Sequence, residues 1–223
     1  MTIRSGGGSG GRAVVLLSGG LDSGVAGAVF RRDGGTVVAA LFCDYGQRAV
    51  AREAAAAARL AARWSVPFRR VELPWLAGLA QQSGSRLMAG TGALPQGSVA
   101  APGNEASARA VWVPARNAVF VAIAAAHAEA LGGDTVVAGF NREEAATFPD
   151  NSAAFLAAAS ACLQLGPRSG VVVASPTLEW DKPRIVAEAK ALGFTAGDFW
   201  SCYEGGAEPC GRCESCLRSR WQR

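Results

Sequence analysis

The sequence predicts an α/β fold built on a parallel sheet with helices on both faces. Short apolar runs rich in valine recur along the chain, and long alanine-rich segments separate them. The runs are continuously hydrophobic rather than alternating, which is typical of strands covered on both faces. The alternation of strand and helix then indicates parallel strands joined by right-handed crossovers.

Five short runs are the expected strands of this sheet. They are residues 13–17, 36–43, 68–73, 134–139 and 171–175, of which 68–73 has the weakest signal. The expected helices are the alanine-rich segments 24–32, 48–64, 116–131, 151–165 and 181–192. The segment 116–131 is apolar almost all round, so we expect a buried helix there.

Polar residues on two of the expected helices are interpreted as structural. Arg48, Arg52, Arg59 and Arg63 lie along one stripe of the second helix, which is typical of a solvated outer face. His127 is the only histidine of the chain and lies among alanines, so we predict a packed core residue. Catalysis would then depend on groups other than a free histidine.

The chain has the size and composition of one domain with a small appendage. Its 223 residues are 50% hydrophobic, enough to bury a full core. No apolar run reaches the roughly 18 to 20 residues that cross a bilayer, and residues 1–11 lack the apolar region of a secretory signal. We therefore expect a cytoplasmic protein with a flexible N-terminus at 1–11. The net charge of +4 permits anionic ligands without indicating nucleic acid.

Residues 77–108 are expected to form a long loop. They are rich in Gly, Ala, Ser and Pro and show no helical or strand period. A loop of this length in a compact domain is usually a mobile lid or disordered. We predict a lid, because the segment leads directly into WVPARN (112–117), where polar residues return at the expected start of a helix.

The turn after the first expected strand is a candidate anion site. In SGGLDS (18–23), Gly19 and Gly20 allow a tight turn whose N–H groups can point at one anion, and Asp22 and Ser23 follow at the helix start. The turn is neither G-x-x-x-x-G-K-[ST] nor G-x-G-x-x-G. The structural alternative is a glycine turn in which Asp22 or Ser23 caps the helix.

Four of the six cysteines cluster near the C-terminus and predict a metal site. They are Cys202, Cys210, Cys213 and Cys216. Glycines at 205, 206 and 211 allow the tight turns that a tetrahedral Zn–S₄ site needs. Four cysteines also leave an iron–sulfur cluster open, although the C-x₂-C-x₂-C-x₃-C-P run is absent. Disulfides fit a reducing compartment poorly, so we favour one structural zinc. Cys43 and Cys162 are expected to be small buried hydrophobes.

Several motifs together resemble one enzyme family. VVLLSGGLDSG (14–24) is similar to the pyrophosphate loop (PP-loop) of the N-type ATP pyrophosphatases, which split ATP between its α- and β-phosphates and transfer AMP to a substrate oxygen. FCDYGQR (42–48), WVPARN (112–117) and the cysteine-rich tail resemble the branch of 7-cyano-7-deazaguanine synthases of queuosine biosynthesis. The motifs follow the family's order over residues 13–220.

The resemblance implies a fold, an activity and cofactors. The fold would be Rossmann-like, of the adenine nucleotide alpha hydrolase-like type, over residues 12–198, followed by a zinc module at 199–223. The activity would convert 7-carboxy-7-deazaguanine and ammonia to 7-cyano-7-deazaguanine. One ATP adenylates the carboxylate so that ammonia can form the amide, and a second ATP activates the amide oxygen. Mg²⁺ would accompany ATP, near Asp22.

The resemblance also assigns site residues, all named here by their numbers in this chain. The catalytic residues would be Asp22, Arg116 and Lys182. The ATP-binding residues would be Leu17, Ser18, Gly19, Gly20, Leu21, Asp22, Ser23, Gly24, Asp44, Tyr45, Gly46 and Gln47. The substrate-binding residues would be Asn117, Asn141, Glu143, Glu144, Phe148 and Asp150. A surface or capping role competes for Arg116 and Lys182, and capping of the helix 151–165 competes for Asp150.

The sequence departs from the family pattern at three places, of which the last bears on the substrate. Gly24 and Val25 stand where many members have two threonines, and Ala115 replaces the glycine of V-P-G-R-N. The segment FPDNS (148–152) replaces Y-P-D-C-R in the expected substrate pocket. Amide-forming or deazaguanine-conjugating relatives, or a tRNA-modifying enzyme, therefore stay open as alternatives.

A zinc-finger-like nucleic-acid module is the competing interpretation of the tail. It would use Arg212, Arg218, Arg220 and Arg223 to contact phosphates. We expect no direct binding of nucleic acid, because the aromatic residues that would accompany such a stripe are few. The apolar helices and the tail favour a homodimer.

Overall fold

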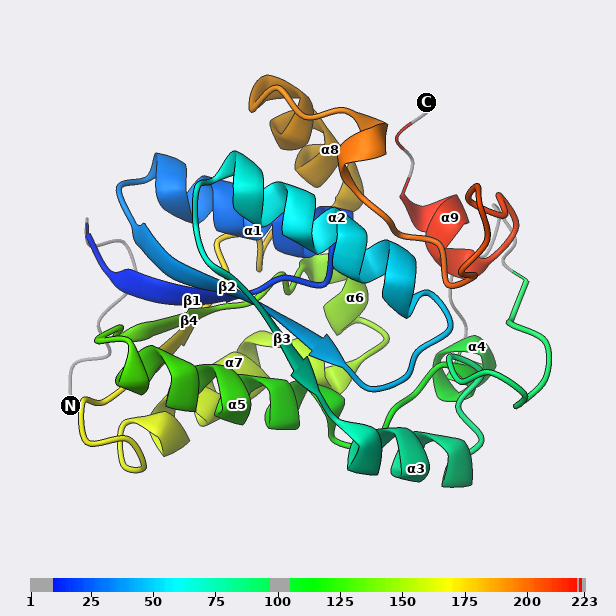
Figure 1. Ribbon diagram of the computed structural model, residues 1–223, viewed down its shortest axis with the longest axis horizontal. Coiled ribbons are helices and arrows are strands. Elements are labelled where there is room, and N and C mark those ends of the chain that lie inside the picture. Colours follow the sequence, from blue (N-terminus) through cyan, green and yellow to red (C-terminus); the bar gives the residue numbers. More distant parts are fainter. Residues whose placement is uncertain (1–9, 97–104, 220, 222–223) are drawn as a thin grey trace.

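The computed structural model describes residues 10–96, 105–219 and 221. At its centre lies a five-stranded sheet in the order β3-β2-β1-β4-β5, in which every pairing is parallel (Figure 1). The strands are β1 (Arg12–Leu16), β2 (Thr36–Asp44), β3 (Phe68–Glu72), β4 (Thr135–Val137) and β5 (Val172–Ala174). The predicted parallel α/β fold is confirmed, and all five expected runs form strands.

Helices cover both faces of the sheet, as Figure 1 shows. Those on one face are α1 (Leu21–Arg32), α2 (Val50–Arg63) and α8 (Lys182–Ala191). Those on the other face are α5 (Arg116–Ala130) and α7 (Ala153–Leu163). The first face is the larger core, in which Val25, Leu60 and Ile185 are buried against Val15 of β1. Burial of such side chains is the main stabilising contribution to the layered fold.

The helix expected to be wholly buried, α5, is buried along one side only. Val121, Ala124 and Ala128 face inward, whereas Ala122 is exposed. That expectation was wrong because alanine leaves so little apolar area in water that an alanine-rich surface is tolerated. His127 is half-buried rather than packed in the core, which corrects a second expectation for this helix.

The arginine stripe of α2 is more than a solvated face. Arg52 Nε donates to the carbonyl oxygen of Gly206 at 2.8 Å, and Arg63 Nη2 donates to that of Gly193 at 2.9 Å. Arg59 reaches the same stretch of chain. Arg52, Arg59 and Arg63 are exposed, as expected for a solvated face, and their guanidinium groups also hold the segment that follows α8 along the length of α2.

The segment predicted as the lid, 77–108, is helical at both ends. Helix α3 (Pro74–Gln82) begins before it, and α4 (Glu105–Ala110) ends after it. The described residues between the helices pack through buried apolar side chains, among them Leu87, Met88 and Leu94. The prediction of an unbroken loop was wrong because Leu76 and Ala80 have the spacing of a helix that begins before the glycine-rich stretch.

Residues 97–104 of that segment lie outside the described residues, and the lid stays a prediction. The same holds for residues 1–9 of the N-terminus that was expected to be flexible, and for Arg220 and Arg223 of the tail. Shorter elements complete the described chain: α6 (Arg142–Ala145), η1 (Pro149–Asn151), η2 (Ala196–Asp198) and α9 (Glu214–Arg218). Among the described residues, no helix is both long enough and apolar enough to cross a membrane.

Candidate active site and metal centre

A cavity of about 270 Å³ lies at the carboxyl ends of β1, β2 and β4. Ligands of open parallel α/β sheets bind at this edge, because the loops that leave the strands meet there. The turn after β1 forms one wall, and the loop after β2 and the start of α5 form another. The chain that follows η2 returns to close the site with Trp200, Ser201, Tyr203 and Ser215.

The turn after β1 is held by its two serines. Ser18 Oγ lies 3.0 Å from Ser23 Oγ, and the Ser18 N–H donates to the same Ser23 oxygen at 3.2 Å. Gly20 is the N-cap of α1, and no side chain caps this helix. The alternative in which Asp22 or Ser23 is the cap is therefore wrong. The turn leaves the positive end of the α1 dipole facing the cavity, which suits an anion.

Glycine is required at two points around this turn. Gly19 has φ of +81°, and a Cβ there would lie 2.3 Å from the backbone oxygen of Glu53 in α2. Gly139 follows β4, and its Cβ would lie 2.5 Å from the backbone nitrogen of Ser23. Contacts this short are forbidden to real side chains, so α2 and β4 press directly on the turn and fix its shape.

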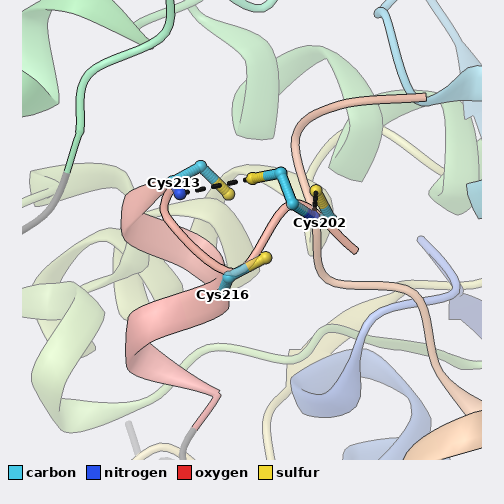
Figure 2. A group of neighbouring side chains, drawn as sticks. Cys202, Cys213 and Cys216 are labelled. Atoms are coloured by element: carbon cyan, nitrogen blue, oxygen red, sulfur yellow. Dashed lines mark hydrogen bonds between the residues drawn. The ribbon is translucent and has the colours of Figure 1, made fainter. Parts of the chain in front are cut away.

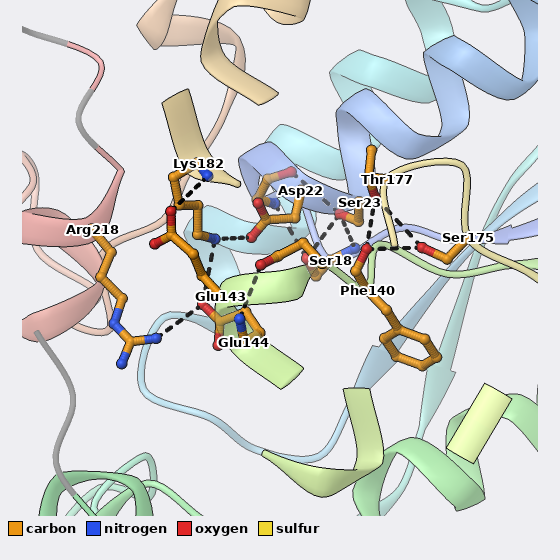
Figure 3. A network of polar contacts seen from close by, with 12 residues as sticks. Ser18, Asp22, Ser23, Phe140, Glu143, Glu144, Ser175, Thr177, Lys182 and Arg218 are labelled. Atoms are coloured by element: carbon orange, nitrogen blue, oxygen red, sulfur yellow. Dashed lines mark hydrogen bonds and ion pairs between the residues drawn. The ribbon is translucent and has the colours of Figure 1, made fainter. Parts of the chain in front are cut away.

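A buried chain of charges runs behind the turn (Figure 3). Lys182 Nζ lies 2.5 Å from Asp22 Oδ2 and 3.4 Å from Glu144 Oε1. Arg218 of α9 reaches the same Glu144 oxygen with Nη1 at 3.3 Å, and its Nη2 pairs with Glu214. Lys182 is 6% exposed, so the surface role that competed for this residue is wrong. The chain of charges links α1, α6, α8 and α9.

The pKa values in this network follow from burial and pairing. Burial raises the pKa of Asp22, against the attraction of Lys182. Burial also opposes the ionised form of Glu144, but Lys182 and Arg218 outweigh it and hold the pKa of Glu144 below its ordinary value. Asp22 Oδ1 and Arg218 Nε are buried without a hydrogen-bond partner among the described residues. Such atoms suit contact with a ligand.

The start of α5 meets the loop after β2. Arg116 Nη1 donates to Tyr45 Oη at 3.3 Å, and Asn117 Nδ2 donates to the backbone oxygen of Asp150 at 3.2 Å. The N-cap of α7 is Ser152, whose Oγ accepts from the backbone of the first turn at 3.1 Å. The capping role that competed for Asp150 is therefore wrong.

Most of the predicted site residues line the cavity. Those in its wall are Leu17, Ser18, Gly20, Leu21, Asp22, Ser23, Tyr45, Gln47, Arg116, Asn117, Glu144 and Phe148. Those outside its wall are Gly19, Gly24, Asp44, Gly46, Asn141, Glu143, Asp150 and Lys182. Lys182 lines a smaller hollow beside the cavity, together with Asp22 and Glu144.

The predicted residues outside the wall hold neighbouring parts in place. Asn141 Oδ1 caps α6 by accepting from the backbone N–H of Glu144 at 3.0 Å, and Glu143 Oε1 accepts from the backbone N–H of Lys182 at 2.9 Å. A Cβ at Gly24 would meet the Phe199 ring at 2.6 Å, so this glycine serves packing. These contacts position the site from behind.

The sequence did not reveal Glu53 or the residues of the returning tail. Glu53 lies in the first turn of α2 and lines the cavity. Burial raises the pKa of Glu53 to about 7. Its signal in the sequence was an acidic residue among alanines, which is also typical of a solvated helix. The contribution of Tyr203 and Ser215 depends on how the tail folds back, which no local pattern encodes.

The four C-terminal cysteines come together as predicted. Their sulfur atoms all lie within 4.8 Å of one another, and Figure 2 shows Cys202, Cys213 and Cys216 gathered around a common space. Backbone N–H groups of Glu204 and Cys210 each donate to Cys202 Sγ at 3.3 Å. Such bonds favour thiolates, the form that binds a metal ion. The cluster could therefore hold a metal.

The other two cysteines differ from each other. Cys43 is buried as expected, and burial raises its pKa to about 12. It lines the cavity as a neutral thiol. Cys162 is exposed, which corrects the expectation that it is a buried hydrophobe. It lies on the outer side of α7, where small residues are tolerated in water.

Comparison with known proteins decides the family. The family model described as "Queuosine biosynthesis protein QueC" matches residues 12–221. The chain belongs to the QueC family. A 7-cyano-7-deazaguanine synthase of Pelotomaculum thermopropionicum is 48% identical over 211 residues, which cover 93% of this chain and 94% of that relative. One of Bdellovibrio bacteriovorus is 44% identical over 213 residues, covering 94% of this chain and 91% of the relative.

A solved structure extends the likeness of this QueC-family chain to its fold. The U34-tRNA thiolase NcsA from Methanococcus maripaludis, solved with its [4Fe-4S] cluster, matches with a TM-score of 0.52 at 15% sequence identity. The match covers 86% of this chain and 60% of that one. At this identity the match supports the fold alone, and it agrees with the predicted parallel α/β architecture.

Proposed function

We propose that this chain is an ATP-dependent ligase that forms 7-cyano-7-deazaguanine from 7-carboxy-7-deazaguanine and ammonia. The observation that carries the proposal is the SGGLDS turn at the head of the cavity, in a chain whose relatives are named 7-cyano-7-deazaguanine synthases. A carboxylate is a poor electrophile. Adenylation gives it a good leaving group, so the enzyme must hold ATP and the acceptor together.

The residues of the cavity divide this work. The turn 18–23 and the positive end of α1 bind the pyrophosphate part of ATP. Arg116 faces the cavity from the opposite wall, where its guanidinium group balances negative charge that develops during AMP transfer. Lys182 acts on the pyrophosphate end through Asp22, which it holds at 2.5 Å.

The acceptor lies, in this proposal, between α6 and the start of α5. Glu144 and Asn117 offer polar groups there, and a carboxylate can pair with the N1–H and 2-amino group of a deazaguanine. Phe148 lines the same wall and stacks on Trp112 with ring centroids 6.4 Å apart and planes inclined by 9°. This aromatic face suits a flat heterocycle.

The proposed enzyme binds two metal ions, a structural one at the cysteines and one that accompanies ATP. The all-cysteine donor set fits one structural zinc per chain, with no open ligand position for catalysis. Asp22 fits Mg²⁺, because its Oδ1 is a buried carboxylate oxygen without a partner among the described residues. Bound there, Mg²⁺ would neutralise phosphate charge. We further propose a cytoplasmic homodimer that takes small-molecule substrates and does not bind nucleic acid directly.

The test incubates the purified protein with Mg-ATP, ammonium and 7-carboxy-7-deazaguanine. The expected result is the nitrile by mass spectrometry, with AMP and pyrophosphate released only when the acid is present. An amide as the final product would move the chain to an amide-forming activity, which the FPDNS segment keeps open. No AMP release would overturn the proposal. Metal analysis should find about one zinc per chain, lost when Cys213 is replaced by serine.

A further inference from the structure

A carboxylate that the steps above do not use lines the cavity beside the phosphate turn. Glu53 belongs to the first turn of α2, and its backbone oxygen packs against Gly19. Its Oε2 accepts from Gln47 Nε2 at 2.8 Å, while Gln47 Oε1 accepts from the Tyr45 backbone N–H at 3.0 Å. The carboxylate is therefore held in one orientation by the loop that follows β2.

The charges around Glu53 leave it without an ion-pair partner. Arg116, from the start of α5, is the cation that acts on it, and Asp44, from the end of β2, is the neighbouring anion. Arg116 Nη1 donates to Tyr45 Oη, and no lysine or arginine of the described chain lies within 4.0 Å of the Glu53 carboxylate. Tyr45 is itself neutral near pH 7, because burial raises its pKa.

A carboxylate in this position is unfavourable for ATP alone. It faces the same cavity as the turn that grips phosphate, so like charges repel across a partly buried space. A small cation next to Glu53 removes that penalty. The proposed reaction supplies one, because ammonia in neutral water is almost entirely ammonium, which must be bound and lose a proton before it can attack.

From this geometry we infer that Glu53, oriented by Gln47, binds ammonium in the cavity and takes its proton. The inference rests on the proposed function and gives the nitrogen donor its site. A base works best when its pKa lies near the working pH, and burial gives Glu53 a pKa of about 7. The site takes a small cation with N–H donors, since one carboxylate oxygen and the hydroxyl group of Tyr45 offer acceptors.

The step balances in atoms and charge. The Glu53 carboxylate accepts one proton from ammonium, leaving ammonia with a free electron pair. That pair forms a bond to the acyl carbon of the adenylated acid, and the bond from that carbon to the bridging oxygen breaks as AMP leaves with its electrons. The surplus proton on the new C–N nitrogen passes to water. Glu53 then releases its own proton through the open side of the cavity.

The test separates adenylation from nitrogen transfer in the Glu53→Gln variant. Exchange of labelled pyrophosphate into ATP, dependent on the acid and run without ammonium, reports adenylation. Amide formation from ammonium reports nitrogen transfer. Hydroxylamine reports the same attack without the base, because it is already a neutral nucleophile near pH 7. The matched control is Glu105→Gln, whose carboxylate is exposed and does not line the cavity.

Glu53→Gln should show pyrophosphate exchange and hydroxamate formation at wild-type rates or faster, because its side chain no longer repels ATP, and should lose about a hundredfold in amide formation. Wild-type amide formation should rise with pH through about 7. Equal losses in amide and hydroxamate formation, or loss of exchange, would overturn the role of Glu53. Wild-type protein that shows no acid-dependent exchange would overturn the proposed function itself, whatever the variant does.

Discussion

Replacing Glu53 by glutamine should stabilise the fold, and the gain should grow with pH. Burial raises the pKa of Glu53 from an ordinary 4.5 to about 7. The folded chain thus disfavours the ionised carboxylate, which the unfolded chain carries in water. The stability contributed by this group is complete below pH 4.5 and is lost as the pH rises through 7. A glutamine does not titrate and escapes that loss.

The size of the effect follows from the same pKa values. A pKa difference of about 2.5 at 1.36 kcal/mol per pKa unit gives about 3 kcal/mol in full. Of this total, about 2 kcal/mol of stability should be lost between pH 5.5 and pH 8, because the protonation of Glu53 is linked to folding. Glutamine preserves the size of the side chain and an acceptor for Gln47, so the packing around the cavity stays the same.

The assay is urea unfolding followed by tryptophan fluorescence at several pH values in that interval. The free-energy difference between the Glu53→Gln variant and wild type should increase from pH 5.5 to about pH 7 and level off toward pH 8. The Glu105→Gln variant, altered at a carboxylate whose side chain is 79% exposed, should show a difference that does not change with pH. A difference for Glu53→Gln that is equally flat would refute the reasoning, because it would mean that Glu53 titrates normally.

Three further predictions concern the frame of the site. Ala115→Gly should stabilise the fold by about 1 kcal/mol in urea unfolding, since Ala115 has φ of +51°, whereas Ala118→Gly inside α5 should destabilise it by about as much. An increase in the free energy of unfolding from both substitutions would contradict the inference that the backbone of Ala115 is strained. Lys182→Met should cost about 3 kcal/mol of unfolding free energy, because it leaves the Asp22 carboxylate without a cation while Glu144 keeps Arg218, and adding Asp22→Asn should recover part of it. Removal by chelation of the metal proposed at the four cysteines, or Cys213→Ser, should weaken ATP binding about tenfold in a fluorescence titration, because α9 presents its side chains to the site. An unchanged Kd would count against this.

Local patterns predicted the fold and those parts of the candidate site whose residues lie close together in the sequence. A strand, a tight turn and a helix start are encoded within a dozen residues, so the turn at 18–23 and the ends of β1 and β2 could be placed from the sequence. The cysteine spacing worked in the same way. The positive φ of Ala115 also gives a physical reason for the glycine that the family pattern carries at this position.

Contacts distant in sequence could not be predicted. Arg218 and Glu144 lie 74 residues apart, and nothing near either residue indicates the other. Glu53 is one acidic residue on an alanine-rich helix, and only the packing of α2 against the turn shows that it faces the cavity. The prediction that α5 is buried all round was wrong for a different reason. It was based on composition, whereas the arrangement of the layers decides which side of the helix is buried.

The arginines of α2 also bear on the order in which the protein becomes competent during synthesis. Asp22 and Lys182 are separated by 160 residues, and Arg52 and Gly206 by 154. At roughly 5 to 20 residues per second, the second residue of each pair is added about 8 to 30 seconds after the first. Until then the phosphate turn has no wall from the tail and no cation on Asp22. A chain that has been synthesised only as far as α7 therefore lacks both the cation on Asp22 and the cavity wall formed by the residues after η2.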